Sequence, residues 1–237
     1  MAQAIILAGG KGTRLKPYTN VFPKPLVPIC DTPILEIIIR QLARANIKNI
    51  VIITGHLAEL IESYFGDGGK WGVKITYFRE KSPLSTAGAL AYLDNLEEDF
   101  LVLNGDILTT LDFGRLLDEH KKSKATATLS IFKRDNHIDF GVIKKDAKGN
   151  LSDYIEKPTD HYWVSMGVNA LNRRALKAIK KGEALGMPDL LMRLKEAGEK
   201  VRCYEFSDYW LDIGRVDDYE RAQKEFEARR KTFLEGA

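Results

Sequence analysis

The stretch Ala4–Arg14, AIILAGGKGTR, joins an apolar run to a glycine-rich loop, and the rest of the chain is interpreted around it. Its first residues, Ala4–Ala8, have the length and β-branched content of a buried strand. Three glycines within Gly9–Gly12 allow the backbone to pass close to a ligand and to point several N–H groups one way. Arg14 and Lys24 add two cations nearby. Because open α/β sheets bind ligands at the carboxyl ends of their strands, this loop is predicted to hold an oligophosphate.

Two well-known phosphate-binding loops do not match this stretch. The P-loop pattern G-x-x-x-x-G-K-[ST] requires a lysine after its last glycine, and Gly12 is followed by Thr13. The dinucleotide-binding pattern G-x-G-x-x-G can begin at Gly10, but its third glycine would fall on Leu15. The loop belongs to neither class, and taken alone it is also compatible with an ordinary glycine turn carrying solvated charges.

Composition is ordinary for a globular protein. The 237 residues are enough for one large α/β domain, and they are 44% apolar and 29% charged. The 36 basic and 33 acidic residues leave a net charge of +3, which gives no argument for nucleic-acid binding and does not oppose an anionic substrate. Cys30 and Cys203 lack metal-ligand spacing, so we predict that both are small buried hydrophobic residues.

No segment predicts secretion or membrane insertion. The N-terminus lacks the basic and long apolar regions of a signal peptide. The apolar run Ile34–Ile39 is interrupted by Glu36 and followed by Arg40, so it does not predict a membrane span. We expect a cytoplasmic protein, with neither a membrane nor nucleic acid as a partner, and without an appended domain after the last predicted helix.

Strands and helices alternate in the first half of the chain, whereas turns separate the strands of the second half. Apolar spacing predicts helices over 31–46, 57–65, 86–93, 172–179, 188–197 and 216–229. Strands are predicted over 4–8, 50–54, 73–78, 100–104, 125–132, 141–144, 151–155, 164–171 and 201–205. This order predicts an α/β fold around a mostly parallel sheet. We expect one domain, 1–237, with an N-terminal nucleotide-binding half of about 1–110 and a C-terminal half of about 111–237 that closes over it.

Two aspartates stand out as candidate metal ligands. Asp106 comes just after the predicted strand 100–104, at the sheet edge that holds the glycine loop, and Asp212 lies in Tyr209–Gly214, YWLDIG. One or two carboxylates together with substrate phosphates are the usual way in which proteins hold Mg²⁺. A lone aspartate after a strand is more often a cap or turn residue, and the two are about a hundred residues apart in the sequence.

The combination of LAGGKGTRL and a following PKPL resembles the signature of the sugar-1-phosphate nucleotidyltransferases, also called nucleotide-sugar pyrophosphorylases. The resemblance extends from residue 4 to about 225 through six separated motifs, and is most like the mannose-1-phosphate and heptose-1-phosphate guanylyltransferase branch. It implies a three-layer, Rossmann-like mixed sheet of the nucleotide-diphospho-sugar transferase type. It also implies that Asp106 and Asp212 bind Mg²⁺, and that Arg14 and Lys24 are catalytic with them.

The same resemblance assigns a sugar-phosphate site to the second half. Glu156 and Lys157 belong to an E-K-P motif, in which the glutamate accepts from sugar hydroxyls and the lysine binds the sugar phosphate. Gly141 and Gly167 match two glycine strands of the family, and Asn169 occupies a position that is often aromatic in relatives. Without that context, E-K-P is more simply a surface turn with an opposed charge pair.

The base is predicted from Glu80 and from Ser85–Leu90, which resembles the P-L-G-T-A-G-A-L of guanylyl- and some uridylyltransferases, with Ser85 in place of the usual glycine. An ionised carboxylate only accepts hydrogen bonds, and guanine offers two adjacent donors, which favours GTP. UTP or dTTP remains the alternative, since Glu80 is also compatible with a solvated strand-end charge. The residues expected to contact the nucleotide are Leu7, Ala8, Gly9, Gly10, Lys11, Gly12, Thr13, Arg14, Lys24, Glu80, Ser85, Thr86, Gly88, Asn104 and Gly105.

The predicted reaction is therefore attack of a sugar 1-phosphate on the α-phosphorus of an NTP, which gives an NDP-sugar and pyrophosphate. Mannose- and heptose-type sugars are favoured, glucose is an alternative, and a homo-oligomer is compatible with the sequence. Two other classes remain: a metal-dependent glycosyltransferase, which would release free NDP, and a non-catalytic nucleotide-sugar sensor. A sensor is expected to lose one of Arg14, Lys24, Asp106 and Asp212, and all four are present.

Overall fold

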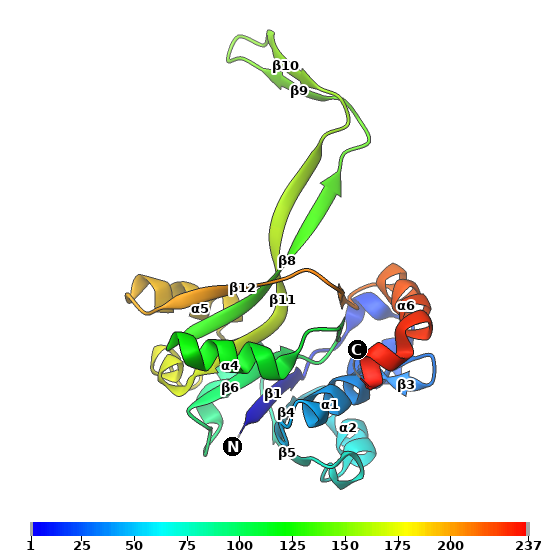
Figure 1. Cartoon of the computed structure of the whole chain (residues 1–237), viewed down its shortest axis with the longest axis vertical. Coiled ribbons are helices and arrows are strands. Elements are labelled where there is room, and N and C mark those ends of the chain that lie inside the picture. Colours follow the sequence, from blue (N-terminus) through cyan, green and yellow to red (C-terminus); the bar gives the residue numbers. More distant parts are fainter. Residues whose placement is uncertain (1, 236–237) are drawn as a thin grey trace.

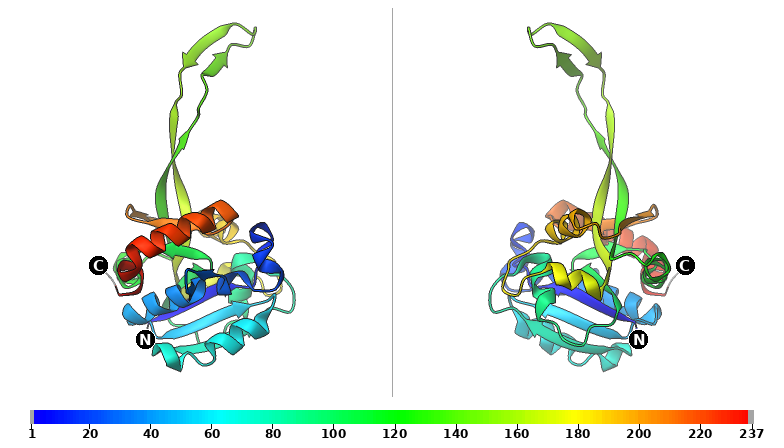
Figure 2. Two further views of the ribbon diagram at one scale, coloured as in Figure 1. Left: turned by 90° about the vertical axis from the view of Figure 1, so that its right-hand side faces the viewer. Right: turned by 90° about the vertical axis from the view of Figure 1, so that its left-hand side faces the viewer.

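A seven-stranded mixed sheet with helices on both faces forms the body of the protein, whose computed structural model describes residues 2–235 (Figures 1 and 2). The strands lie in the order β12 (Val201–Phe206), β8 (Ala127–His137), β11 (Thr159–Asn172), β6 (Asp99–Asn104), β1 (Gln3–Ala8), β4 (Asn49–Thr54) and β5 (Lys74–Arg79). Within this sheet only β11 runs antiparallel to its neighbours. The predicted mostly parallel α/β fold is confirmed.

The apolar run of the first strand lies at the centre of this sheet. β1 pairs in parallel with β4 on one side and with β6 on the other, so both of its edges are satisfied. Its side chains alternate between two cores: Ala4 and Ile6 belong to one, and Ile5 belongs to the other. Burial on both faces explains why the run is continuous rather than alternating in hydrophobicity.

Helices cover each face. The core on one face includes side chains of α1 (Ile34–Arg44), α2 (Ala58–Phe65), α4 (Phe113–Ser123) and α6 (Val216–Leu234). The core on the other face includes side chains of α3 (Ser85–Gly88), the following 3-10 turn η5 (Ala89–Tyr92), the 3-10 segment η6 (Arg173–Ala178) and α5 (Met187–Glu196). None of the helices within residues 2–235 is both long and apolar enough to cross a bilayer.

Some local predictions were wrong. The helix α4 was not predicted, although Phe113, Leu116, Leu117 and His120 are buried at helical spacing and Asp112 caps the helix by accepting from the Arg115 N–H (2.9 Å). The helix predicted over 86–93 is one turn of α-helix followed by a 3-10 turn, and the helix predicted over 172–179 is 3-10 throughout.

Both cysteines are exposed, so the prediction that they are buried was wrong. Cys30 lies in the tight turn between β2 (Pro28–Ile29) and β3 (Thr32–Pro33), with a φ of 53°, and turns of this kind run over the surface. Cys203 lies on β12, the edge strand of the sheet, where one side of the strand is unpaired.

The segment of residues 133–164, below called the arm, projects from the body as a long two-stranded ribbon (Figures 1 and 2). The outer parts of β8 and β11 pair from Trp163↔Lys133 to Thr159↔His137, and the tip is formed by β9 (Val142–Lys145) and β10 (Leu151–Ile155). The expected strands are present, and the arm extends away from the sheet; closure of the second half over the first stays a prediction.

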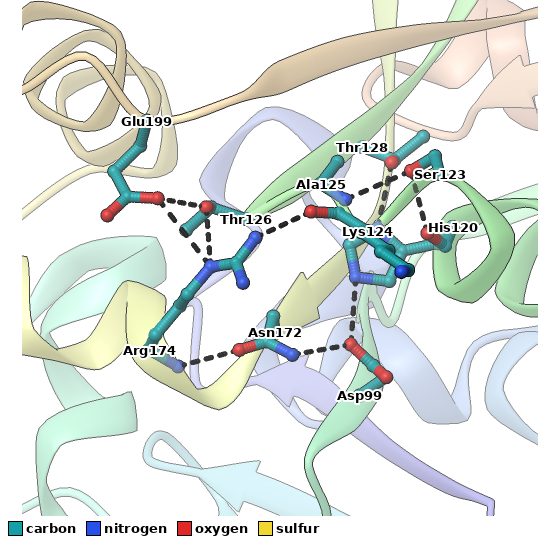
Figure 3. Close-up of polar contacts among 10 residues, drawn as sticks. All are labelled: Asp99, His120, Ser123, Lys124, Ala125, Thr126, Thr128, Asn172, Arg174 and Glu199. Atoms are coloured by element: carbon teal, nitrogen blue, oxygen red, sulfur yellow. Dashed lines mark hydrogen bonds and ion pairs between the residues drawn. The ribbon is translucent and has the colours of Figure 1, made fainter.

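A polar network fixes the sheet at the edge opposite the glycine loop (Figure 3). His120 Nδ1 lies 2.8 Å from Thr128 Oγ1 and its Nε2 lies 3.3 Å from Asp99 Oδ1, which also accepts from Asn172 Nδ2 (2.8 Å). Burial lowers the pKa of His120, and the Asp99 carboxylate opposes that shift. The network therefore joins α4, β6, β8 and β11 at the edge remote from the predicted site.

Candidate active site

The glycine loop follows β1 at the carboxyl edge of the sheet. Gly12 begins the 3-10 turn η1 (Thr13–Leu15) with a φ of 61°, and the Thr19 hydroxyl donates to the Gly12 carbonyl oxygen (2.8 Å). A Cβ atom at Gly12 would lie 3.0 Å from Lys24 Cβ, whereas one at Gly10 would meet open space among the described residues. The loop is thus packed against Lys24 at one end and open to a ligand at the other.

Lys24 and Asp106 form an ion pair beside this loop. Lys24 is buried at the start of the 3-10 segment η3 (Lys24–Leu26), and its amino group donates to Asp106 Oδ2. The Gly105 N–H donates to the Leu7 carbonyl oxygen (3.0 Å), which holds the ends of β6 and β1 together. A cavity of about 250 Å³ between them is lined by Leu7, Ala8, Gly10, Gly12, Thr13, Arg14, Lys24, Pro25, Gly105, Asp106 and Gly214.

Asp212 reaches the same place from the other half of the chain. β13 (Trp210–Asp212) pairs antiparallel with β7 (Ile107–Thr109), and this register sets Asp212 opposite Ile107. The Ile213 N–H donates to the Asp106 carbonyl oxygen (3.0 Å). This short ladder is the physical reason why two aspartates far apart in the sequence lie side by side.

Arg14 completes the group. A Cβ atom at Gly214 would lie 3.4 Å from Asp212 Oδ2 and 3.5 Å from Arg14 Nη1, so Gly214 permits the guanidinium to lie near the carboxylate. Burial, and then the neighbouring Asp106 carboxylate, raise the pKa of Asp212, while Lys24 and Arg14 oppose this rise. The structure therefore brings the four predicted catalytic residues together, and their roles stay predictions.

The two carboxylates fit a divalent cation. Asp106 Oδ1 is buried and has no hydrogen-bond partner among the described residues, which is rare for a polar atom. Within residues 2–235, no three His, Cys, Asp or Glu side chains gather into a metal cage, so an ion here needs oxygens from substrate and water as well. Mg²⁺ prefers this kind of site, and binding by Asp106 and Asp212 remains a prediction.

A second cavity, of about 290 Å³, contains Glu80. Glu80 Oε1 accepts from the Leu84 N–H (3.1 Å), and Oε2 would lie 2.6 Å from a Cβ atom at Gly9, so this glycine allows the carboxylate to approach the loop. Burial raises the pKa of Glu80, and the Leu84 hydrogen bond opposes that rise. The cavity is lined by Leu7, Gly9, Gly10, Ile53, Glu80, Pro83, Ser85, Thr86, Asn104 and Asp106.

Ser85 has a φ of 61°, the left-handed conformation that favours glycine. This conformation explains why glycine is the usual residue at this position in the family that the sequence resembles, and Ser85 adopts it at a cost in backbone strain. Gly88 lies outside the lining of the two cavities, and it packs against the Glu183 carbonyl oxygen, which leaves no room for a Cβ atom. Lys11 is exposed and also lies outside both linings. Contacts of Gly88 and Lys11 with a nucleotide stay predictions.

A larger, mainly apolar cavity of about 530 Å³ adjoins the Glu80 cavity through Leu7, Thr86 and Asn104. Gly167 has a φ of 70°, and the Asn104 side-chain amide occupies the space that its Cβ would need. Asn169 is buried in the same wall, with Oδ1 unpaired among the described residues. Sequence reasoning missed the remaining wall, which α5 provides through Met187, Pro188, Leu191, Met192 and Lys195.

Basic residues that sequence reasoning missed line a cavity of about 600 Å³ on the other side of Asp212. Arg215 and Arg221, at the start of α6, face Lys133 and Arg134 at the base of the arm across this cavity. Arg215 directly follows the W-L-D-I-G motif, so its sequence position was the available signal.

The remaining predicted sugar-phosphate residues lie away from this cleft. Gly141, Glu156 and Lys157 are at the tip of the arm. Met166, where β11 becomes buried, is nine positions after Lys157 in the sequence, which corresponds to roughly 30 Å of extended chain. Their sugar-phosphate role stays a prediction, and within one copy the structure does not bring them to the cleft.

The fold and the site define a nucleotide-binding α/β class: a parallel sheet whose carboxyl edge carries a glycine loop, two cations and two converging carboxylates. Comparison with known proteins then gives the family, because a nucleotidyl transferase model matches residues 3–229. The chain belongs to the nucleotidyl transferase family. The predicted resemblance is thereby confirmed.

Individual relatives carry different names. The chain is 32% identical to a mannose-1-phosphate guanylyltransferase of Mycobacterium tuberculosis over 92% of its own length and 62% of the relative's. It is 31% identical to a D-glycero-α-D-manno-heptose 1-phosphate guanylyltransferase of Aneurinibacillus thermoaerophilus over 95% and 98%, respectively. A Bacillus anthracis structure assigned as a glucose-1-phosphate thymidylyltransferase has a TM-score of 0.75 at 26% identity, and the match covers 94% of each chain. The chain thus spans about three-fifths of the first of these relatives.

Proposed function

We propose that this protein joins an NTP and a sugar 1-phosphate to give an NDP-sugar and pyrophosphate, with Mg²⁺ held by Asp106 and Asp212. The observation that carries the proposal is the convergence of these carboxylates beside the glycine loop, with Asp106 Oδ1 buried and unpaired among the described residues. Family membership supports the reaction class.

The residues of the cleft match the demands of nucleotidyl transfer, in which positioning and charge neutralisation supply most of the rate. The loop N–H groups from Gly10 to Thr13 and the Arg14 guanidinium bind the triphosphate and the leaving pyrophosphate. Lys24 binds phosphate oxygens near the reaction centre, and to do so it gives up its ion pair with Asp106. When bound, Mg²⁺ offsets the charge that develops on the α-phosphate.

GTP is the proposed nucleotide. The support is the position of Glu80, whose carboxylate lies in the cavity next to the glycine loop, where a base would lie beyond a phosphate-bound ribose. An ionised carboxylate accepts from the two adjacent donors of guanine, whereas uracil and thymine offer one N–H. A mannose- or heptose-type sugar 1-phosphate is proposed as the second substrate, in keeping with the two guanylyltransferase relatives.

The test is a matrix of GTP, UTP, dTTP, ATP and CTP against the 1-phosphates of mannose, a manno-heptose and glucose, with Mg²⁺, in which pyrophosphate release is measured. GTP with one of the first two sugars should be the most active pair, and Asp212→Asn should lower kcat by about 10²- to 10³-fold. Faster turnover with UTP or dTTP would refute the guanine preference. If the protein releases no pyrophosphate in this matrix but releases free NDP when it is given an NDP-sugar, it is instead a glycosyltransferase.

A further inference from the structure

The arm exposes an unusual amount of apolar surface. Thirteen large hydrophobic side chains are exposed within residues 2–235, and seven of them lie on the arm: Phe140, Ile143, Leu151, Tyr154, Ile155, Tyr162 and Trp163. From their exposed fractions, these seven side chains present roughly 800 Å² of surface, which is about one partner's share of a stable protein–protein interface. Surface of this size on a single element indicates a docking site.

The arm also lacks support from its own chain. Beyond Phe132 and Val164 it has only two strands, with no helix or third strand packed on them (Figures 1 and 2). A two-stranded hairpin without a partner is marginally stable in water. The arm therefore needs a surface against which it can pack.

The tip carries an ordered polar cluster that no part of the same chain uses. The Tyr154 hydroxyl donates to Glu156 Oε2 (3.1 Å), and it occupies the place of the Cβ that Gly141 lacks. Lys157 is held at a φ of 44°, and no hydrogen bond or ion pair of its side chain is seen among the described residues. Backbone strain of this kind is concentrated at functional sites, so the tip is built to meet something polar.

The cleft can use the cation that the tip carries. Within the cavity that holds the glycine loop, Lys24 is already paired with Asp106 and Arg14 lies near Asp212, whereas two phosphorylated substrates bring further negative charge. The cleft is also open, because the segment that leaves β8 extends away from it (Figure 1). In this conformation, Lys157 lies about 30 Å beyond the buried part of β11 and does not serve the cleft of its own chain.

A second copy of this chain fits these requirements better than nucleic acid or a membrane. The arm holds six Lys or Arg and six Asp or Glu, so it has no net charge with which to attract nucleic acid or an anionic membrane. Each copy presents one arm and one open cleft, and a two-fold axis can satisfy both at once in a closed dimer.

We propose that the arm of one copy packs across the cleft of a second copy, so that Glu156 and Lys157 face the sugar-1-phosphate side of a composite active site. This inference rests on the proposed function, because the sugar 1-phosphate is the ligand that the tip meets. The apolar arm residues pack on the partner copy, and Lys157 adds a cation on the sugar-1-phosphate side of its cleft.

The test is complementation between two variants. Asp212→Asn has a defective cleft and an intact arm, whereas Lys157→Met has an intact cleft and a defective arm. In a co-expressed pair, half of the dimers are mixed and each mixed dimer holds one intact site, so activity should reach about a quarter of the wild-type value. If the arm serves its own cleft, the mixture will show only the mean of the two separate variants, and the proposal is overturned. GTP and mannose 1-phosphate are used, or whichever pair of the matrix turns over fastest.

A second measurement does not depend on activity. Light scattering should show a dimer for the wild type and a monomer for Ile143→Asp, whose parent side chain is 53% exposed at the tip. Leu60→Asp is the matched control, because Leu60 is 40% exposed on α2 and should leave the dimer intact. A monomeric wild type, or an Ile143→Asp variant as dimeric as the control, overturns the arm exchange. A dimer that dissociates as expected but releases no pyrophosphate would refute the proposed function and leave the exchange standing.

Discussion

Replacement of Lys24 by methionine tests the electrostatics of the cleft most directly. Methionine keeps much of the length and the apolar stem of lysine, but it removes the charge that is paired with Asp106. The Asp106 carboxylate, which already has one unpaired buried oxygen, then lies near Asp212 with Arg14 as the remaining neighbouring cation. The variant should therefore be less stable than the wild type in the absence of metal.

The magnitude follows from burial. Removal of one partner from a fully buried ion pair costs about 3–5 kcal/mol. Because a quarter of the Asp106 side chain is still exposed while Lys24 is nearly covered, a smaller loss of about 2–3 kcal/mol is expected here. For a chain of this size, that loss corresponds to a fall in Tm of roughly 5–10 °C.

Thermal unfolding without Mg²⁺ gives the first measurement. The double variant Lys24→Met/Asp106→Asn removes both charges and should recover about 1–2 kcal/mol, since contacting charges are strongly coupled. Saturating Mg²⁺ should raise the Tm of Lys24→Met by more than it raises the Tm of the wild type, because a cation bound to the carboxylates replaces the missing charge. Equal stability of Lys24→Met and wild type, with no coupling to Asp106→Asn, would refute the reasoning.

Three further predictions concern other positions. Glu80→Gln should lower kcat/KM for GTP by about 10- to 100-fold and should change kcat/KM for UTP much less. An equal loss of kcat/KM with the two nucleotides would contradict a role of Glu80 in base recognition. Because burial lowers the pKa of His120, folding stability in urea should decrease as pH falls below about 6.5, by at most about 1.4 kcal/mol per pH unit, and His120→Gln should flatten that slope unless another group causes it. Gly167→Ala should lower Tm more than Gly149→Ala, since both have positive φ but only Gly167 faces the Asn104 amide, and an equal effect would show that strain alone matters.

The central sheet and most of the site could be predicted because their signals are local. The run Ala4–Ala8 has one stable environment, between two parallel neighbours, and a ligand loop at its carboxyl end follows from that placement. Asp106 is fixed by its position after β6. Asp212 depended on the resemblance, since its place is set by the ladder between β13 and β7, and no spacing in the sequence encodes that pairing.

Exposure was harder to predict than secondary structure. Cys203 lies in a strand, as predicted, but only the order of the strands in the sheet shows that β12 is an edge strand. The helix α4 was not predicted despite its cap and its buried face, because most of its residues are polar. The pattern of a single strand or helix does not state which neighbours cover it.

The direction of the arm has a similar origin, and it links the two proposals. Strand periodicity predicts β8 and β11 as strands, but neither their pairing nor the angle at which the pair leaves the sheet. That angle is set where the register of the pair shifts. On β11 the shift lies between Ser165 and Asn169, whereas the paired residues on β8, Ile131 and Leu129, are only two positions apart. Extra residues on one strand bend and twist a ribbon. Gly167 lies within this bulge against Asn104, so the feature that turns the arm away from the body also forms a wall of the cleft. An open cleft and an exposed arm are thus two consequences of one backbone irregularity, and a change that straightens it should alter catalysis and dimerisation together.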